Sequence, residues 1–572
     1  MLNPSPKPEI EPTSSAAAAS GRRRLFTTIG VMTLGVSLFI LLIALLRPER
    51  NGLAKDGDDG HEKMVKKEEI FKEFPRDDKG KLLKPHLVLV FSGQTIGYMQ
   101  PCGCSEPQYG GLARRYQFLE FVRGLDWPVV ALDLGDNAPA HMSGQGLLKY
   151  RYIMRGLELM RYGAVGLGKN EFLAPFELAL SQHTLDNHDP PVVATSLKGA
   201  EPEGVWSKTG VNATHVITKG GIKIGVLSVL GPTVEAEVAK QTGLGIKKEG
   251  AALAEGLKDL QAKKVHIGVL LFHGDEAEAT AVTAQAYKLH KEGMGPLLHA
   301  VVYLSPGDPG DSAKQIRDIP TQIVTAGEKG KNLGLLAFYN KPAGLEMHYK
   351  RVAVSPEFQP TPAEALKSPL TDLWQKYADD LKAKNFLSPR MTPRSPHPTQ
   401  VALGKKEEAS YVGSERCKSC HEEAYKVWKK SKHAHAFETL EVAKFPSGRQ
   451  YDPECILCHT VGFKHERGYA DPADVAAIDK HNARLRGVGC ESCHGPASMH
   501  VKNPAEEKYY PLINPYGARA GARRFKLIEW NLCLKCHDDE NDVHWRAGSF
   551  DKKWKEIAHP TPPDERRTAE KE

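Results

Sequence analysis

Two parts of the chain stand out by the pattern of their hydrophobic positions. Leu25 to Leu46 is an uncharged apolar run, long enough to cross a bilayer core of about 30 Å as a helix. Residues 85–355 alternate between short apolar runs, such as "HLVLVFSG" and "KKVHIGVLLFHG", and longer stretches with helical spacing. The first pattern predicts a transmembrane helix, and the second predicts an α/β domain.

The predicted α/β domain contains three clear helix candidates. They span Leu112 to Gly124, Gly146 to Arg161 and Gly250 to Ala262. Because they lie among the apolar runs that predict strands, we expect these helices to cover the faces of a sheet.

The segments outside this domain predict less regular structure. Residues 1–24 combine prolines, serines and alanines and indicate a disordered tail, and residues 47–84 form a charged linker. Residues 356–410 are rich in proline around one helical stretch, "LTDLWQKYADDLKAKNF", which indicates a second linker. Residues 411–572 remain as a C-terminal domain.

The C-terminal domain carries a repeated cysteine motif. Four segments read Cys-x-x-Cys-His, and they hold eight of the ten cysteines of the chain. The cysteines are Cys417, Cys420, Cys455, Cys458, Cys490, Cys493, Cys533 and Cys536, and the histidines are His421, His459, His494 and His537. Two thiols at this spacing add to the vinyl groups of a porphyrin, and the adjoining histidine binds its iron. A zinc site would not require a histidine after each pair, so the motifs predict four covalently bound c-type haems.

Haem is attached to such motifs outside the cytoplasm, so the chain must be exported. "GRRR" at 21–24 precedes the apolar run and favours a cytoplasmic N-terminus, although Arg47 and Arg50 reduce the asymmetry. A cleaved signal peptide is the alternative, but "LLRPERNG" lacks the small residues of a cleavage site. We therefore expect a single-pass anchor in the inner membrane, with the bulk of the chain on the periplasmic side.

The charge of the chain argues against a nucleic-acid partner. The 77 lysines and arginines stand against 70 acidic residues, a formal net charge of +7, and the two signs are interspersed. This pattern is typical of a solvated surface. The haem motifs instead predict redox proteins as partners.

Five short blocks of the α/β domain occur in the order found in one enzyme family. They are "GGLARR" at 110–115, "ALDLGD" at 131–136, "GAVGLGKNEF" at 163–172, "VLLFHG" at 269–274 and "TAGEKGKNLG" at 325–334. In this order they resemble the blocks of 5′-nucleotidase-type, or calcineurin-like, metallophosphatases. The resemblance implies a four-layer α/β sandwich for residues 85–355.

Most metal ligands of that family are missing. Its Asp-x-His motif is replaced by Ser92 to Gln94, and Lys169 and Asn170 stand where an asparagine and a histidine are expected. Only Asp136 and His273 remain of the expected ligands, and two residues cannot hold the two metal ions that phosphate hydrolysis requires. The ammonium of Lys169 would also repel a cation. We therefore predict a catalytically degenerate domain without phosphatase activity.

The loop after the first predicted strand has gained two cysteines. Cys102 and Cys104 occur in "MQPCGCSEPQYGG", a loop that the resemblance implies to be beside the same pocket as Asp136 and His273. Three interpretations remain open: a strained, reducible disulfide, a soft-metal site that includes His273 or Asp136, and a purely structural loop. Export to an oxidising compartment favours the disulfide over free thiols.

The surroundings of the haem motifs resemble a second family. The segments "YVGSERCKSCHEEAYKVWKKSKHAHAFETL", "ECILCHTVGF", "GVGCESCHGPASMHV" and "IAHP" follow one another between 411 and 560. In this order they resemble the tetrahaem cytochromes c that accept electrons from hydroxylamine oxidation. The resemblance implies a mainly helical fold with haems stacked in close pairs.

A second histidine commonly closes the open face of a haem iron in an electron carrier. The candidates in matching sequence context are His433, His435, His500 and His559. Because His433 and His435 point differently on a helix, only one of them is expected to bind iron.

Together these features predict an extracytoplasmic, membrane-anchored tetrahaem cytochrome that transfers electrons, with the degenerate domain as a docking or accessory module. The expected architecture is a transmembrane helix, an α/β four-layer sandwich and a mainly α multihaem domain. The alternative is an enzyme. In that case one haem keeps an open position for a small nitrogen or sulfur compound, or the pocket of Cys102 and Cys104 performs thiol chemistry.

Overall fold

The computed structural model describes residues 67–559, apart from gaps at 102–107, 141–142, 185–188, 306, 308–312, 343, 405–406, 445, 473–474, 515–521, 539–540, 543 and 546–548. The predicted tail at 1–24, the predicted transmembrane helix at 25–46 and the cysteines Cys102 and Cys104 lie outside the described residues. Among the helices that are described, none is both long and apolar enough to cross a membrane.

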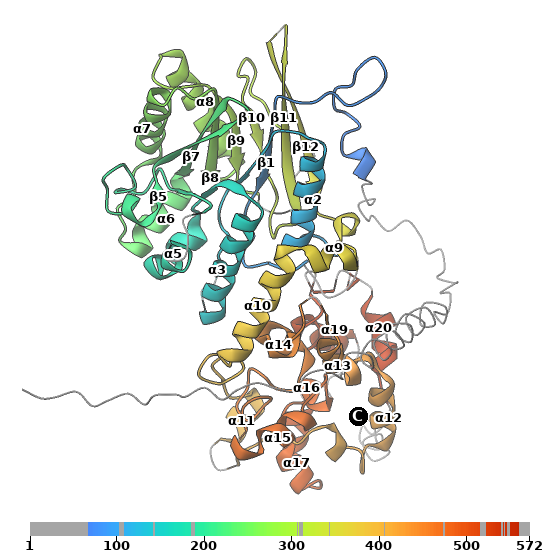
Figure 1. Ribbon diagram of the computed structural model, residues 1–572. Helices are drawn as coiled ribbons and strands as arrows, with labels where there is room; N and C mark the ends of the chain where they lie inside the picture. The colour runs from blue at the N-terminus through green and yellow to red at the C-terminus, as the bar shows by residue number, and fades with distance from the viewer. Residues whose placement is uncertain are drawn as a thin grey trace, which may run out of the picture. The chain divides into compact units, whose positions relative to one another are not determined.

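Two β-sheets form the centre of the α/β domain (Figure 1). The strands are β1 (Leu87–Ser92), β2 (Val129–Asp133), β3 (Tyr162–Gly166), β4 (Val192–Val193), β5 (Val211–Asn212), β6 (Thr214–Lys219), β7 (Ile222–Leu230), β8 (Ile267–His273), β9 (Leu298–Tyr303), β10 (Gln322–Val324), β11 (Asn332–Lys341) and β12 (Gly344–Ala353). The larger sheet has the order β12-β11-β1-β2-β3-β4-β5, and the smaller has the order β10-β9-β8-β7-β6. Strand β1 pairs parallel with β2 and antiparallel with β11.

Strand β1 shows why the two sheets pack face to face. All six of its residues are buried. Val88 and Val90 belong to the hydrophobic cluster under the helices, whereas Leu87, Leu89 and Phe91 belong to the cluster between the sheets. Because successive side chains of a strand point to opposite faces, a strand that is apolar throughout is stable only when both faces are covered.

Helices cover the outer face of each sheet (Figure 1). Helices α2 (Leu112–Gly124) and α3 (Gly144–Leu159) cover the seven-stranded sheet, and α7 (Glu249–Ala262) and α8 (Glu276–Lys291) cover the five-stranded sheet. The domain is completed by α4 (Lys169–Leu173), α5 (Phe176–Thr184) and α6 (Pro232–Thr242). Two sheets between two helical layers form the four-layer α/β sandwich that the sequence predicted.

The predicted linkers contribute to this core. Between α9 (Pro362–Lys367) and α11 (Pro398–Leu403) lies α10 (Pro369–Ala383), which packs against α3 and α2. Its buried side chains include Leu370, Trp374 and Leu381, and Phe71 from the preceding linker joins the same cluster. Because apolar residues at helical spacing require a covered face, α10 belongs to the α/β domain and not to a free linker.

The C-terminal domain is built from short helices and loops. The helices are α12 (Glu422–Lys430), α13 (Ala436–Glu441), α14 (Pro453–His459), α15 (Ile478–Arg484), α16 (Cys490–His494), α17 (Ser498–Lys502), α18 (Tyr510–Ile513), α19 (Ala522–Asn531) and α20 (Phe550–Ile557). Its described hydrophobic side chains form two small clusters, one around Tyr411 and Phe463 and one around Trp545. The mainly helical character agrees with the prediction.

Candidate functional site

The four Cys-x-x-Cys-His motifs adopt helical turns. The second and third motifs lie in α14 and α16, and the fourth includes a 3₁₀ turn at Cys533–Lys535. In the first and fourth motifs the N–H of the histidine donates to the carbonyl of the first cysteine, at 2.9 Å in both His421 and His537. The histidine therefore follows the first cysteine by one helical turn, on the same side. In the described part of the chain, none of the eight motif cysteines forms a disulfide.

The thiols bring the motifs together in pairs. The thiol of Cys490 lies close enough to that of Cys417 to raise its pKa, which places the first motif beside the third. The thiol of Cys536 likewise raises the pKa of the Cys458 thiol, which places the second motif beside the fourth.

Three of the motif histidines face a second histidine ring. The ring centroids are 6.2 Å apart for His421 and His500, 6.0 Å for His537 and His433, and 6.1 Å for His494 and His559. A metal–imidazole bond is about 2 Å long, so a metal ion held between two imidazoles separates their ring centroids by roughly 6 Å. The separations and the donor chemistry therefore fit three bis-histidine iron sites.

Two other histidines are arranged differently. The ring of His435 contacts the Glu438 carboxylate at 3.2 Å and the Lys429 carbonyl at 3.1 Å, so both of its nitrogens are engaged away from any motif. His459, of the second motif, donates its Nδ1 proton to the carbonyl of Ala436 at 2.6 Å. In the described part of the chain, no ring contact joins His459 to another histidine.

The protonation of these rings suits metal binding. Burial lowers the pKa of His433, His459 and His494. A lowered pKa keeps the imidazole neutral, which is the form that binds iron.

A buried carboxylate fixes the third motif. Glu491, between the two cysteines, is 3% exposed and accepts the backbone N–H groups of Val412, Gly413 and Ala497 at 2.8 to 3.0 Å. It ties this motif to the segment that leads into the first motif. The role of Glu491 could not be predicted from the sequence, because an acidic residue inside a motif gives no sign that it is buried.

The α/β domain keeps the two residues predicted as remnants of a metal site. Asp136 follows β2, His273 ends β8, and Asp136 Oδ2 lies 3.8 Å from His273 Nδ1. His273 is completely buried, and within the described residues neither ring nitrogen has a hydrogen-bond partner. The structure thus brings Asp136 and His273 together, whereas Cys102 and Cys104 lie outside the described residues.

The residues that replace the other ligands are engaged in internal contacts. Ser92 donates to Asp133 at 2.5 Å, and the amide of Gln94 pairs with both backbone groups of Ser305. Lys169 forms an ion pair with Glu237 at 2.7 Å, and the Asn170 amide donates to the carbonyl of Ala138 at 3.0 Å. In the described part of the chain, no three histidine, cysteine or acidic side chains are grouped to hold a metal. These residues do not fit the two-metal centre that the fold family implies.

Arg115, which was not predicted as a site residue from the sequence, is a further reason why two metal ions do not fit here. Its side chain, on α2, is fully buried and lies 3.6 Å from Asp133 Oδ2 and 3.3 Å from the hydroxyls of Ser92 and Thr95. A guanidinium is always charged, so a fixed cation stands at the end of the first strand. Only its place in the "GGLARR" block hinted at a role.

Glu171 is the most strongly perturbed acid near Asp136. Burial, together with the charge of Asp136, raises the pKa of Glu171 to about 8. Its oxygens accept the backbone N–H groups of Asp136, Asn137, Ala138 and Gly168, which oppose the shift. Glu171 therefore holds the Asp136 loop in place.

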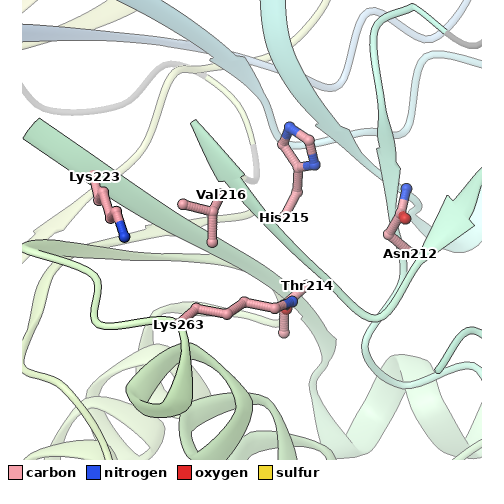
Figure 2. A pocket seen from close by; sticks show the side chains of 6 residues that line it. All are labelled: Asn212, Thr214, His215, Val216, Lys223 and Lys263. Carbon is pink, nitrogen blue, oxygen red and sulfur yellow. The ribbon is translucent and has the colours of Figure 1, made fainter. Parts of the chain in front are cut away.

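A separate surface pocket of about 420 Å³ lies at the edge of the five-stranded sheet (Figure 2). Its lining residues are Asn212, Thr214, His215, Val216, Lys223 and Lys263. The ammonium of Lys263 forms an ion pair with Asp259 at 2.6 Å and donates a hydrogen bond to the Thr214 hydroxyl at 2.8 Å. None of the predicted site residues lines this pocket.

Comparison with protein families supports the haem assignment of the C-terminal domain. Residues 416–495 match the family "Cytochrome c554 and c-prime". The matched segment contains the first three Cys-x-x-Cys-His motifs, and the fourth lies beyond it. The predicted resemblance to this family is therefore confirmed for that segment.

Two curated proteins are similar over part of the chain. Cytochrome c-554 of Nitrosomonas europaea is 36% identical over 100 residues, which are 16% of this chain and 40% of that protein. The multihaem cytochrome MtrA of Shewanella baltica is 30% identical over 118 residues, which are 19% of this chain and 31% of that protein. The chain thus spans less than half the length of either relative.

Solved structures similar to this chain include a 5′-nucleotidase precursor, a sulfate thiohydrolase and a calcineurin-like phosphoesterase. A 5′-nucleotidase precursor from Thermus thermophilus has a TM-score of 0.39 and 20% identity, and covers 52% of this chain and 59% of its own. The sulfate thiohydrolase SoxB of T. thermophilus has a TM-score of 0.41 and 14% identity, and the match covers 54% of this chain and 63% of SoxB. The calcineurin-like phosphoesterase YfkN of Bacillus subtilis has a TM-score of 0.38 and 17% identity, and the match covers 52% of this chain and 98% of the YfkN chain. At these scores the similarities say nothing about chemistry.

Proposed function

We propose that the chain is a membrane-anchored, extracytoplasmic tetrahaem cytochrome that passes electrons between redox proteins. Three pairs of histidine rings at 6.0 to 6.2 Å carry this proposal. Six imidazoles placed at bis-histidine spacing have no simpler explanation in a domain whose motifs bind haem covalently.

The chain supplies attachment, ligands and burial. Each motif would hold one porphyrin through two thioethers, and the iron would be held by His421 with His500, by His494 with His559 and by His537 with His433. Bound haem supplies reversible one-electron transfer. The thiol contacts between motifs one and three, and between motifs two and four, support short distances between neighbouring haems.

The apolar run from Leu25 to Leu46 serves as the anchor in this proposal. It contains no charged residue and follows "GRRR", so the haem domain would lie on the far side of the membrane from the N-terminus. Electron donors and acceptors then meet the protein outside the cytoplasm.

The α/β domain acts as a docking or accessory module. Its former ligand positions are occupied by internal hydrogen bonds, by Arg115 and by the Lys169–Glu237 ion pair. The α/β domain would therefore not hydrolyse phosphate esters.

A second function is favoured by His459. Because its ring faces no other histidine in the described part of the chain, iron bound there would keep one position free for a small ligand. The protein would then act on a small nitrogen or sulfur compound at the second haem and pass the electrons to the other three.

One set of measurements tests both functions. The intact mass of the exported chain should exceed that of the polypeptide by four haems, and a mass without haem would refute both. Carbon monoxide added to the reduced protein should change the absorption of one haem in four. An unchanged spectrum would exclude the second function and leave the carrier. A His459→Ala variant should change the position of the carbon monoxide signal, because the imidazole ligand of that iron is lost, while keeping the three bis-histidine signals.

A further inference from the structure

The fourth motif differs from the others in what holds its histidine. His537 Nδ1 lies 2.8 Å from Oδ2 of Asp542. By contrast, His459 and His494 donate their Nδ1 protons to the backbone carbonyls of Ala436 and Ile513, at 2.6 and 2.7 Å. Within the described residues, Asp542 is the only carboxylate paired with a motif histidine.

Asp542 is held firmly in this position. It is 8% exposed, and Lys553 on α20 donates to the same oxygen at 2.7 Å. The other oxygen accepts the backbone N–H of His544 at 3.2 Å. The side chain therefore contacts an ammonium, an imidazole N–H and a backbone N–H, which is the environment of an ionised carboxylate.

The ring of His537 is also fixed from its face. Trp545 stacks on it with ring centroids 4.7 Å apart and an interplanar angle of 27°. Trp545 in turn donates its Nε1 proton to Glu529 at 3.1 Å. The orientation of the hydrogen bond to Asp542 is thus set by packing.

An ionised acceptor on Nδ1 makes the opposite nitrogen more basic. Asp542 draws the Nδ1 proton toward itself, which increases electron donation from Nε2 to a bound metal. Greater donation stabilises ferric over ferrous iron, and a backbone carbonyl acts in the same direction more weakly because it carries no full charge.

We propose that Asp542 is a positioning residue that makes the haem bound through His537 the most difficult of the four to reduce, and that Lys553 moderates this effect. The inference rests on the proposed function, because it requires a haem at the fourth motif. Reduction adds one electron from the donor protein to ferric iron and gives ferrous iron. The Nδ1 proton stays in the hydrogen bond between His537 and Asp542.

The structure offers two substitutions with opposite expected effects. Asp542→Asn replaces the charged acceptor by a neutral one, so the most negative of the four reduction steps should move to a more positive potential. Lys553→Met leaves the carboxylate without its ammonium partner, so the same step should move to a more negative potential. A substitution that merely loosened the fold would not move the step in opposite directions.

A spectroelectrochemical titration of the full-length, haem-loaded protein measures these shifts. Glu529→Gln is the matched control, since it removes a nearby carboxylate that binds Trp545 and not His537. It should shift the same step less than Asp542→Asn does. If the Asp542→Asn variant fails to incorporate the fourth haem, the shift of the most negative reduction potential in Lys553→Met alone tests the proposal.

The outcomes separate this inference from the proposed function. The role of Asp542 alone would be overturned if the protein carries four haems by mass but Lys553→Met leaves the most negative reduction potential unchanged. It would also be overturned if Glu529→Gln shifts that potential as much as Asp542→Asn does. A wild-type protein without four haems would instead overturn the proposed function.

Discussion

The rings of His433 and His537 face each other with centroids 6.0 Å apart, although His433 follows the first haem motif and His537 closes the fourth. The fourth motif therefore finds its partner in a segment that precedes the second motif. His435, two residues from His433, is 46% exposed at its side chain and contacts Glu438 instead.

This difference gives a direct test of the ligand assignment. His433→Ala should convert one of the four haems from low spin to high spin, because iron at His537 would lose its second imidazole. Electron paramagnetic resonance of the oxidised protein measures the change. The matched His435→Ala variant should keep the wild-type spectrum, and a high-spin signal additional to that of the wild type would reverse the assignment of the two histidines.

Removal of the Glu491 carboxylate should destabilise the haem domain. Glu491→Ala leaves three buried N–H groups without their acceptor, and each such loss costs about 1–3 kcal/mol. We expect a loss of at least ~2 kcal/mol in the free energy of unfolding, measured by guanidinium denaturation followed at the haem absorption band. Glu423→Ala, at an exposed ion pair with Lys426, should change the stability by less than about 0.5 kcal/mol.

The α/β domain should not hydrolyse phosphate esters. The full-length protein with manganese should release no phosphate from nucleotides above the protein-free rate, because Ser92, Gln94 and Lys169 are engaged in internal contacts. Gln94→His restores one ligand of the family pattern and should also be inactive, since two metals need several ligands. Manganese-dependent turnover by the wild type would show that the pocket is not degenerate.

Acid should weaken the α/β domain through His299 on β9. Burial lowers the pKa of His299 from its ordinary value of 6.5 to about 4, because the charged ring cannot be solvated. The folded state thus binds fewer protons than the unfolded state between these values, so stability is lost as pH falls from 6.5 to 4, by up to about 3 kcal/mol.

Calorimetric unfolding at pH 7 and pH 4.5 checks this prediction. His299→Gln cannot titrate and should lose less stability between the two pH values than the wild type. His266→Gln, at an exposed position that accepts a hydrogen bond from the Lys223 N–H, should retain the wild-type loss. Equal losses in all three proteins would show that His299 is not the group responsible.

The regular parts of the α/β domain were predictable because their patterns are strong. The predicted helix from Leu112 to Gly124 coincides with α2, and the predicted helix at 250–262 lies within α7. Strand β12 could not be predicted in this way, because it is largely half-exposed and mixes polar with apolar residues. Its register is set by pairing with β11 along its whole length, which is not visible in the local sequence.

In the haem site, too, the features that depend on local sequence were predictable, and those that depend on tertiary contacts were not. The cysteines and their adjoining histidines follow from spacing along a few residues, so the sequence predicts all twelve. The choice of His433 over His435, and the pairing of each motif with its partner histidine, depend on contacts between distant segments. Asp542 was not predicted, because nothing in its neighbourhood marks it as the acceptor for His537.

The three histidine pairs also have a mechanical consequence for the folded domain. Each iron would join two distant points of the chain, at 421 and 500, at 433 and 537, and at 494 and 559. The loop 421–500 overlaps the loop 433–537, which in turn overlaps the loop 494–559. The three iron–histidine cross-links would therefore connect the whole of this segment. Closing a long loop reduces the entropy of the unfolded chain. Fraying from either end would then have to break an iron–histidine bond, which would increase the resistance of the domain to proteases.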